Sequence, residues 1–347
     1  MIKLQNIYYM MAYAFRLLDS KGQAKVDPDK FDGALDLYAA ILHMEVSNQV
    51  KKGLAKGYVE LTDTLRSPRG KMHVSQSIKQ NTIVSKQIVC TVDDYIEDTE
   101  VNRILKATMR QLVRSQDVKK DQVRKLKKLL FYFDYVGECS LKSVKWRSLH
   151  VHRHLSSYRP LMQLCELIVD SLLLSEDEGV KTAPHIVDDQ ALHRLYEKFV
   201  LAYYKRHYPD FRPRASAIGW DVAGEDTAFL PSMQTDIVLH HKGRRLIIDT
   251  KYYTRTMQTN SLYNSRSLHS SNMYQMYTYV MNMGCGKPGA VEGMLLYAKT
   301  DEAITPNQSH EISGYRISAK TLDLDTDFEE IRSQLDEIAE GFMERVV

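Results

Sequence analysis

The sequence predicts an α/β protein with two domains: an N-terminal α+β domain at 1–175, and a C-terminal domain at 184–347 built on a mixed β-sheet flanked by helices. After residue 184, short apolar runs alternate with amphipathic helical stretches, which suits a sheet covered by helices. At 174–184 apolar periodicity stops, and charged and turn-forming residues cluster. The chain has 347 residues, of which 44% are hydrophobic, so it can bury a core in each half.

The elements of the N-terminal half follow from apolar spacing. Helical periodicity predicts helices at 6–18, 35–50 and 97–114, and two short apolar runs predict strands at 58–61 and 88–92. The intervening segment 65–72 contains Ser-Pro-Arg-Gly and is predicted to be an exposed basic loop, with Arg66, Arg69 and Lys71 as its cations.

The C-terminal half begins with a predicted helix at 188–203, which an aspartate can cap. Two strands, a helix at 270–283, a strand at 293–297 and a final helix follow. Thr326 and Glu329 fit a capping box in front of the final helix. Each helix carries apolar residues at helical spacing: Leu192, Leu195, Phe199 and Tyr203; Met273, Met276, Tyr277, Val280 and Met281; and Phe328, Ile331, Leu335, Ile338 and Phe342.

The two strands are predicted to form a tight β-hairpin that brings two aspartates face to face. Gly243 can adopt positive φ, which favours a two-residue loop at Lys242–Gly243. In that register, or with a four-residue loop, Asp236 falls opposite Asp249 with Cβ atoms roughly 4.5–5.5 Å apart. Residues i and i+2 of a strand share a face, so Lys251 lies beside Asp249.

Facing carboxylates repel each other unless a cation lies between them. Mg²⁺, with Mn²⁺ as a substitute, prefers carboxylates, water and a backbone carbonyl such as that of Thr250. Lys251 could then orient or deprotonate an attacking water, or offset charge on a phosphorane-like transition state. The alternative is that Asp236 and Asp249 are solvated, with Lys251 as a surface ion-pair partner.

Three further residues are candidates for this site. Gln275 and Tyr279 lie four apart on one helix face, where they could hold a DNA phosphate or position the lysine and water. Glu197 lies off the apolar stripe of its helix and could add a carboxylate. The alternatives are that Tyr279 is a packing residue and that Gln275 and Glu197 are solvated.

This order of helix with acid, strand with Asp236, strand with Asp249-Thr250-Lys251, and helix with Gln275 and Tyr279 resembles the PD-(D/E)XK nuclease superfamily. The Gln-x-x-x-Tyr spacing is similar to its RecB-type branch. Nearly the whole chain also resembles the McrC family, the nuclease subunits of McrBC modification-dependent restriction systems. Thr235 stands where the superfamily name places a proline. The segments that carry the McrC resemblance are 6–14, 195–199, 230–237, 249–253 and 272–275.

The resemblance implies a restriction-endonuclease-like fold for 184–347 and a Mg²⁺-dependent endonuclease that cuts double-stranded DNA in defence against foreign DNA. The catalytic residues it implies are Asp236, Asp249, Lys251, Gln275 and Tyr279. The metal ligands it implies are Glu197, Asp236, Asp249 and Thr250.

The same resemblance implies an McrB-like AAA+ GTPase hexamer as partner. That partner would recognise modified cytosine such as 5-methylcytosine, while 1–175 would dock to the ring and stimulate its GTPase. The chain itself lacks a Gly-x-x-x-x-Gly-Lys-Ser/Thr loop, so we expect it to bind no nucleotide. Two alternatives are a free-standing RecB-like repair nuclease and a non-catalytic adaptor that grips DNA for a ring ATPase.

The net charge of +3 is unevenly distributed. From Lys119 to Arg159, eleven Lys and Arg stand against three acids, with Tyr132, Tyr135 and Trp146 interleaved. This is a candidate DNA-backbone stripe, and its alternative is a solvated helix face at 119–128. The alternating histidines at 150–154 have no acidic or cysteine partner at zinc-ligand spacing.

The cysteines and the hydropathy pattern bear on the compartment. Cys90, Cys139, Cys165 and Cys285 are scattered without Cys-x-x-Cys spacing, which predicts reduced, buried thiols. No signal peptide and no run of 18 apolar residues is found. We therefore expect a cytoplasmic protein that does not enter a membrane.

Overall fold

The fold is that of a computed structural model, which describes residues 2–15, 31, 33–149, 155–177, 189–222, 229–252, 257–260, 265–285, 287, 289–299 and 305–345. The chain forms two compact units. Residues 35–172 form one, here called the arm unit, and the segments 1–34 and 173–347 form the other, the sheet unit. One boundary falls near the predicted one at 175, whereas residues 1–34 belong to the C-terminal unit and not to the N-terminal one.

The sheet unit is built on a six-stranded mixed sheet in the order β10–β11–β9–β6–β5–β4. β5 (Met233–His241) and β6 (Arg244–Lys251) form an antiparallel hairpin, and β9 (Val291–Ala298) runs parallel to β6. The mixed sheet and these three strands confirm the prediction. Further strands, not predicted, are β4 (Arg214–Ile218), β10 (Gln308–Ile312) and β11 (Tyr315–Leu322) in this sheet, and β7 (Met257–Asn260) and β8 (Ser265–Leu268) in a separate pair.

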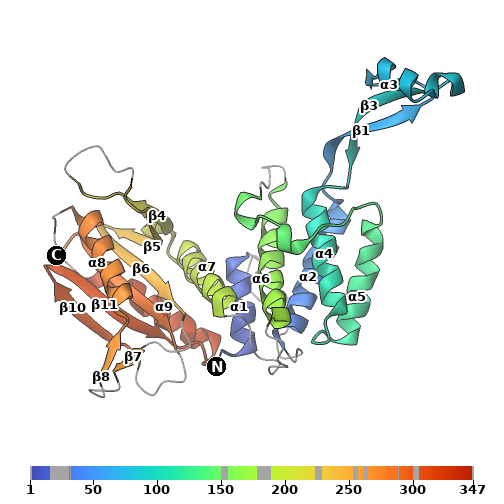
Figure 1. Cartoon of the computed structure of the whole chain (residues 1–347). Helices are drawn as coiled ribbons and strands as arrows, with labels where there is room; N and C mark the ends of the chain where they lie inside the picture. Colours follow the sequence, from blue (N-terminus) through green and yellow to red (C-terminus); the bar gives the residue numbers. More distant parts are fainter. Residues whose placement is uncertain are drawn as a thin grey trace. The chain divides into compact units, whose positions relative to one another are not determined.

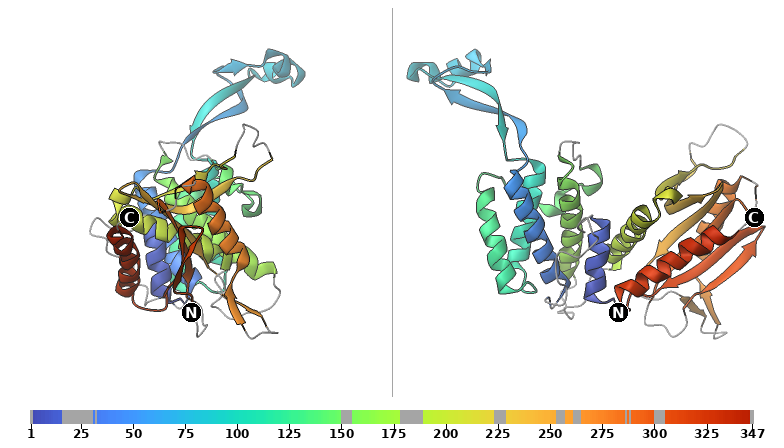
Figure 2. Two further views of the ribbon diagram at one scale, coloured as in Figure 1. Left: turned by 90° about the vertical axis from the view of Figure 1, so that its left-hand side faces the viewer. Right: turned by 180° about the vertical axis from the view of Figure 1, so that it is seen from behind.

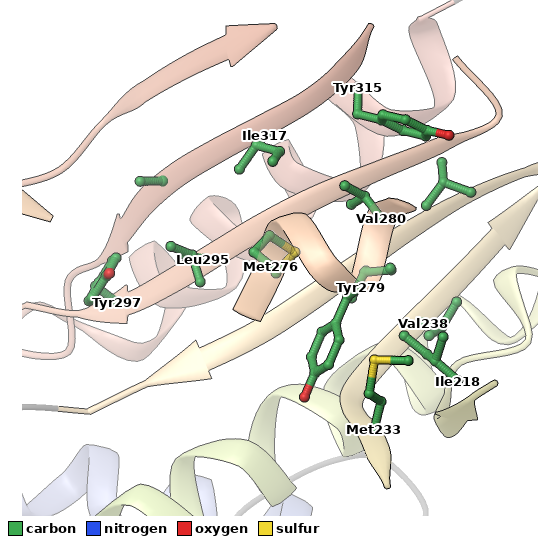
Figure 3. Packing of buried hydrophobic residues seen from close by; sticks show 13 residues of the cluster. Ile218, Met233, Val238, Met276, Tyr279, Val280, Leu295, Tyr297, Tyr315 and Ile317 are labelled. Carbon is green, nitrogen blue, oxygen red and sulfur yellow. The ribbon is translucent and has the colours of Figure 1, made fainter. Parts of the chain in front are cut away.

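Helices cover both faces of the sheet, with α8 (Ser270–Gly284) on one face and α7 (Asp189–His207) and α9 (Phe328–Glu344) on the other (Figure 1). Met276 and Val280 of α8 are buried in the apolar core between this helix and the strands (Figure 3). A Cβ at Gly293 of β9 would lie 2.5 Å from the Met276 sulfur, so glycine there permits the close approach of α8. The predicted apolar faces of these helices are confirmed.

The first helix, α1 (Leu4–Ala14), packs against α7 and α9. The Tyr9 ring stacks on Phe328 with centroids 4.1 Å apart, and the Tyr13 hydroxyl lies 2.9 Å from the His207 Nε2. Asn6 is buried, and its amide donates to two backbone carbonyls just before α9, those of Leu324 and Thr326. These contacts explain why the N-terminal helix belongs to the sheet unit.

The predicted capping box of α9 is wrong. The N-cap residue is Asp327, and its side chain makes no capping hydrogen bond. Its carboxylate instead pairs with Lys3 at 2.9 Å, while the carbonyl of Thr326 is taken by Asn6. Contacts with α1 therefore replace the local cap that the sequence of this segment suggested.

The arm unit consists of a helical body and a projecting sheet (Figures 1 and 2). The body holds α2 (Ala34–Lys52), α4 (Glu100–Arg114), α5 (Lys120–Leu130) and α6 (Tyr158–Asp177). The sheet is antiparallel, in the order β1–β3–β2, with β1 (Gly57–Leu65), β2 (Lys71–Met72) and β3 (Ile88–Ile96). We call residues 57–96, which include α3 (Val74–Lys79), the arm. Short 3₁₀ helices are η2 (Thr82–Ser85), η3 (Phe131–Phe133), η4 (Leu141–Ser143), η5 (Trp146–Ser148) and, in the sheet unit, η7 (Pro209–Phe211).

A buried polar network fixes the root of the arm. The Asn102 amide donates to the carbonyls of Ala55 and Glu97, which precede β1 and follow β3. The Tyr158 hydroxyl donates to the Asn102 amide oxygen and accepts from the Ala55 amide. Because each of these groups is satisfied, the network holds the two ends of the arm to the helical body.

The predicted basic loop at 65–72 lies at the far end of the arm and is exposed, as expected. Gly70 has a φ of +70°, and a Cβ there would lie 2.3 Å from the Thr91 carbonyl oxygen. Glycine is therefore required where this turn packs back on β3. Arg66, Arg69 and Lys71 all face solvent.

Other predictions have mixed outcomes. Cys285 is exposed, so the expectation that all four thiols are buried is wrong. The capping aspartate at 188 and the histidines at 150–154 lie outside the described residues. Within the described ranges, no helix is both long and apolar enough to span a bilayer.

Candidate functional site

The predicted hairpin positions the site. Lys242 and Gly243 have φ values of 46° and 81°, so both loop residues adopt the left-handed conformation of a two-residue turn whose twist suits antiparallel strands. The ladder runs from His241↔Arg244 to Ile237↔Ile248, which confirms the predicted register. β6 is buried along nearly its whole length, including its polar end at Asp249, Thr250 and Lys251.

The hairpin ladder ends one pair before Asp236 and Asp249. Beyond the last pair, a side chain and not the backbone of β5 bonds to β6: Asp236 Oδ2 accepts a hydrogen bond from the Thr250 amide at 2.8 Å and one from the Thr250 hydroxyl at 2.7 Å. The other oxygen, Oδ1, accepts no hydrogen bond from the described residues. One oxygen thus fixes the carboxylate against β6 and the second stays available for a ligand.

Thr235, which stands where the superfamily name has proline, is buried and has a structural role. Its hydroxyl donates to the Ser216 carbonyl at 3.1 Å and accepts the Ser216 amide at 3.2 Å. These bonds hold β4 to β5 at an irregularity in the register between Arg214 and Ser216. A proline has no side-chain donor and could not replace this contact.

Asp249 and Lys251 form a buried ion pair, with 2.6 Å between Oδ2 and Nζ. Burial raises the pKa of the Asp249 carboxyl to about 6; Lys251 opposes the rise, and Asp236 adds to it. Lys251 Nζ takes up one lone pair of Asp249 Oδ2 at this distance, and the carboxylate oxygen has a second lone pair for another partner. The alternative of a solvated surface pair does not describe this site.

Gln275 and Tyr279 extend this pair into a chain of hydrogen bonds. Lys251 Nζ donates to Gln275 Oε1 at 3.0 Å, Gln275 Nε2 donates to the Tyr279 hydroxyl at 2.8 Å, and that hydroxyl donates to the Gln234 carbonyl at 2.9 Å. Tyr279 therefore directs the amide oxygen of Gln275 toward the lysine. Of the roles that the sequence left open, the geometry favours positioning of Lys251 over direct phosphate contact, because the Tyr279 ring is buried.

Glu197 projects from α7 and is partly buried. Burial, together with the charges of Asp236 and Asp249, raises the pKa of its carboxyl to about 7, and Lys198 opposes the rise. Within the described residues it forms neither a hydrogen bond nor an ion pair. Its carboxyl is thus a third acid in the field of the two aspartates, and it forms no ion pair within the described part of the chain, where only the charge of nearby Lys198 opposes the rise of its pKa.

His193, one helical turn before Glu197, was not among the predicted residues. Burial lowers the pKa of its imidazole, which also responds to the charges of Asp236 and Lys251. Its Nδ1 is buried and has no hydrogen-bond partner in the described part of the chain. The spacing of four between His193 and Glu197 places both on one helix face and could have indicated it.

The residues fit a hard divalent cation, although the site is not preassembled. Among the described side chains, no three His, Cys, Asp or Glu residues meet closely enough to hold an ion. The available donors are nevertheless those that Mg²⁺ or Mn²⁺ prefers: Asp236 Oδ1, Asp249 Oδ2 and the Glu197 carboxyl. Burial is the main cause of the raised pKa values of Asp249 and Glu197 and the charge of Asp236 adds to it, so a bound cation would favour the charged form of both carboxyls.

Comparison with known proteins gives the family. The family model described as "McrBC 5-methylcytosine restriction system component" matches residues 5–298. The chain belongs to the McrBC family. This confirms the resemblance drawn from the sequence, and the match covers both α1 and the site residues.

The individual proteins that the chain matches are only distantly similar to it in sequence. The chain is 24% identical to the Type IV methyl-directed restriction enzyme EcoKMcrBC of Escherichia coli K12, over 99% of this chain and 98% of that protein. Among solved structures, this chain matches one chain in a half-complex of Thermococcus gammatolerans McrB AAA+ hexamers with bound McrC. The match covers 96% of this chain and 75% of that chain, at 17% identity and a TM-score of 0.48. The McrBC complex of the same organism matches 58% of each chain, at 20% identity and a TM-score of 0.40.

Proposed function

We propose that this McrBC-family protein is the Mg²⁺-dependent DNA endonuclease component of its restriction system, with a PD-(D/E)XK site in the sheet unit. The observation that carries the proposal is the continuous arrangement of Asp249, Lys251, Gln275 and Tyr279 beside Asp236. An ordinary surface hairpin would carry its acid and lysine in solvent. Here the pair is buried, and two further side chains orient the lysine. Such an arrangement suits hydrolysis of a phosphodiester bond.

Each side chain has a chemical task in this proposal. Asp236 Oδ1, Asp249 and Glu197, with the Thr250 carbonyl, would hold the cation, and His193 offers an imidazole nitrogen beside them. Mg²⁺, when bound, supplies positive charge to the phosphoryl oxygens and lowers the pKa of a coordinated water. Lys251 is held by Asp249 and Gln275 at the edge of this group, where its ammonium can orient the nucleophile and balance charge that develops on the phosphate.

The arm supports the assignment of a protein partner. Large apolar side chains near its far end are exposed, next to the cations of the loop at 65–72. Contiguous exposed apolar surface of this kind marks interaction sites. We infer that the arm, anchored at Asn102, docks to a McrB-like AAA+ GTPase hexamer that recognises modified cytosine, and that this contact stimulates the GTPase. The exposed apolar residues are Met72, Val74, Ile78, Ile83 and Val84.

The test uses the full chain co-expressed with a McrB-like AAA+ GTPase, and methylated and unmethylated DNA. We expect cleavage that requires GTP, Mg²⁺ and methylation. Asp249→Ala should abolish cleavage yet leave partner binding and GTPase stimulation unchanged, because Asp249 lies in the sheet unit. Asp210→Ala is the matched control, since that aspartate is exposed in the same unit.

Three outcomes would contradict parts of the proposal. Mg²⁺-dependent cleavage by Asp249→Ala would refute the site. Cleavage by the isolated chain without GTP would indicate a free-standing nuclease of the RecB type. Mg²⁺ affinity that is unchanged in Asp236→Asn, with no cleavage under any condition, would indicate a non-catalytic adaptor.

A further inference from the structure

An exposed face of the arm unit carries cations followed by aromatic rings. Helix α5 continues into η3, and the backbone stays helical from Leu130 through Asp134. The exposed basic and aromatic residues recur along this path mostly at steps of three and four, which places them on one side of the helix. In chain order they are Lys120, Arg124, Lys127, Lys128, Phe131, Tyr132 and Tyr135.

The opposite side of the same path is buried in the helical body, which fixes which residues face outward. Buried and exposed positions alternate with helical periodicity through both α5 and η3. The exposed face is therefore a property of the packing and not of a free terminus. The buried residues are Gln122, Leu126, Leu129, Phe133 and Val136.

The four cations of this face are not committed to protein carboxylates. Lys125 pairs with Asp121 at 2.6 Å, but Lys120, Arg124, Lys127 and Lys128 form no ion pair with any residue that the structure describes. Asp134 is the exposed acid that lies between the aromatic residues. The face thus offers a row of positive charge to a polyanion.

The aromatic end of the face is unusually open. Phe131 is 72% exposed, Tyr132 60% and Tyr135 93%. Rings this exposed contribute little to the core, and three of them close together mark an interaction surface. A purely electrostatic contact with duplex phosphates would make no use of Phe131, which has no polar atom.

We propose that this face binds single-stranded DNA, with the four cations on the phosphates and the aromatic rings stacked on bases. Unpaired bases expose their faces to such rings, whereas the base faces of a duplex are hidden inside the stack. That the strand is DNA rather than another polyanion rests on the proposed nuclease function. The site is on the helical body of the arm unit and uses none of the residues of the candidate active site.

The test is fluorescence anisotropy of the full-length protein with labelled oligothymidylate and with a duplex of equal length, in EDTA so that no cleavage occurs. The triple variant Phe131→Ala, Tyr132→Ala, Tyr135→Ala should lose about tenfold or more in affinity for the single strand and less than about twofold for the duplex. Replacing the four cations by glutamine should make the fall of log K with log salt concentration less steep for the single strand. The magnitude of the slope should decrease by about 2 to 3.

Matched controls come from the same unit. Tyr58→Ala with Tyr95→Ala removes another exposed aromatic pair, and Lys51→Gln with Lys52→Gln removes exposed cations of α2; both should leave binding unchanged. Should the triple variant fold poorly, Tyr135→Ala alone should still weaken single-strand binding, because that side chain is almost fully solvated. Melting temperatures of all variants report whether the fold is intact.

Three results would overturn the proposal. These are tighter binding of the duplex than of the single strand, undiminished single-strand affinity of folded aromatic variants, and tighter binding of an RNA strand of equal length. Asp249→Ala should bind the strand like wild type in EDTA. A failed binding test with intact GTP-dependent cleavage would therefore reject this surface and leave the proposed nuclease standing.

Discussion

The β5–β6 hairpin and the β1–β3 pair are both long antiparallel ladders, yet their surroundings are opposite. β6 pairs with β9 on one side and is packed against helices, so the carboxylate and the lysine at its end, Asp249 and Lys251, are buried. β1 and β3 stand in a three-stranded sheet with most of β1 exposed (Figure 2). Antiparallel pairing alone therefore does not decide what a strand pair can do.

Both ladders also bring acids together. In the arm, Glu60 is directly opposite Asp93, and both are exposed, so water and salt screen their repulsion. At the end of β5–β6, Asp236, Asp249 and Glu197 act on one another with little water, and the pKa values of Asp249 and Glu197 rise. The difference shows that burial decides the effect of two neighbouring acids. Exposed acids are screened by solvent, whereas buried acids become charged more easily when a cation is bound.

The largest effect is expected for the buried lysine. Lys251→Met should lower the rate of cleavage about a thousandfold or more, because it removes a charge held beside the reacting phosphate. It also removes the cation that opposes the raised pKa of Asp249, so any residual activity should shift to higher pH. Lys205→Met on α7, an exposed lysine of the sheet unit, is the control and should leave the pH–rate profile unchanged.

The next effect concerns the hydrogen bonds that orient this lysine. Tyr279→Phe removes the hydroxyl that holds Gln275 and should lower kcat about 10- to 100-fold, with little change in DNA affinity. Tyr274→Phe on the same helix is the comparison, since Tyr274 is 71% exposed. Equal loss in both variants would show that α8 tolerates no change and would argue against a specific role for Tyr279.

A third prediction concerns pH and the metal-free protein. The pKa of Glu197 rises from 4.5 to about 7 on folding, so the folded state holds a proton that the unfolded state has already released. Metal-free stability should therefore fall as pH rises from about 4.5 to about 7. Glu197→Gln should reduce this slope, above all between about pH 6 and 7, and raise the free energy of unfolding at pH 8 by about 1–3 kcal/mol; the part of the slope below pH 6 that Asp249 contributes should remain.

Thermal melts in EDTA at several pH values measure this effect, and Glu330→Gln, an exposed acid of α9, is the control. Mg²⁺ should raise the melting temperature of wild type at pH 8, because it binds the folded state alone. An unchanged slope between about pH 6 and 7 in Glu197→Gln would assign the raised pKa to another group.

The smallest effect is expected in the arm. Asp93→Asn removes the like charge opposite Glu60 and should stabilise the β1–β3 ladder by only about 0.2–1 kcal/mol. Amide hydrogen exchange of β1 and β3 should slow slightly, while exchange in β5 and β6 stays the same. A large gain in stability, or a loss of cleavage, would contradict the contrast between the two ladders.

The candidate site could largely be predicted because its signals are local. The turn at Lys242–Gly243, the strand alternation and the spacing of Gln275 and Tyr279 each depend on a few neighbouring residues. The strands β4, β10 and β11 were missed; β10 in particular is almost wholly exposed and has no apolar pattern. His193 was missed although it lies four residues before Glu197, because that spacing acquires a meaning only once the position of Glu197 near the two aspartates is known.

The sequence by itself determined the family, the hairpin register and the identity of the acids and the lysine, because each is set by residue type and short-range spacing. Only the tertiary structure decided that α1 belongs with α7 and α9, since its partners are distant in the chain: His207 of α7 is 194 residues from Tyr13, and Phe328 of α9 is further still from Tyr9. Tertiary structure also decided burial. Enclosure by β9 and the helices raises the pKa of Asp249 and Glu197, and the hydrogen bond that the Gln275 amide donates to the Tyr279 hydroxyl directs the amide oxygen at Lys251, which no spacing could reveal.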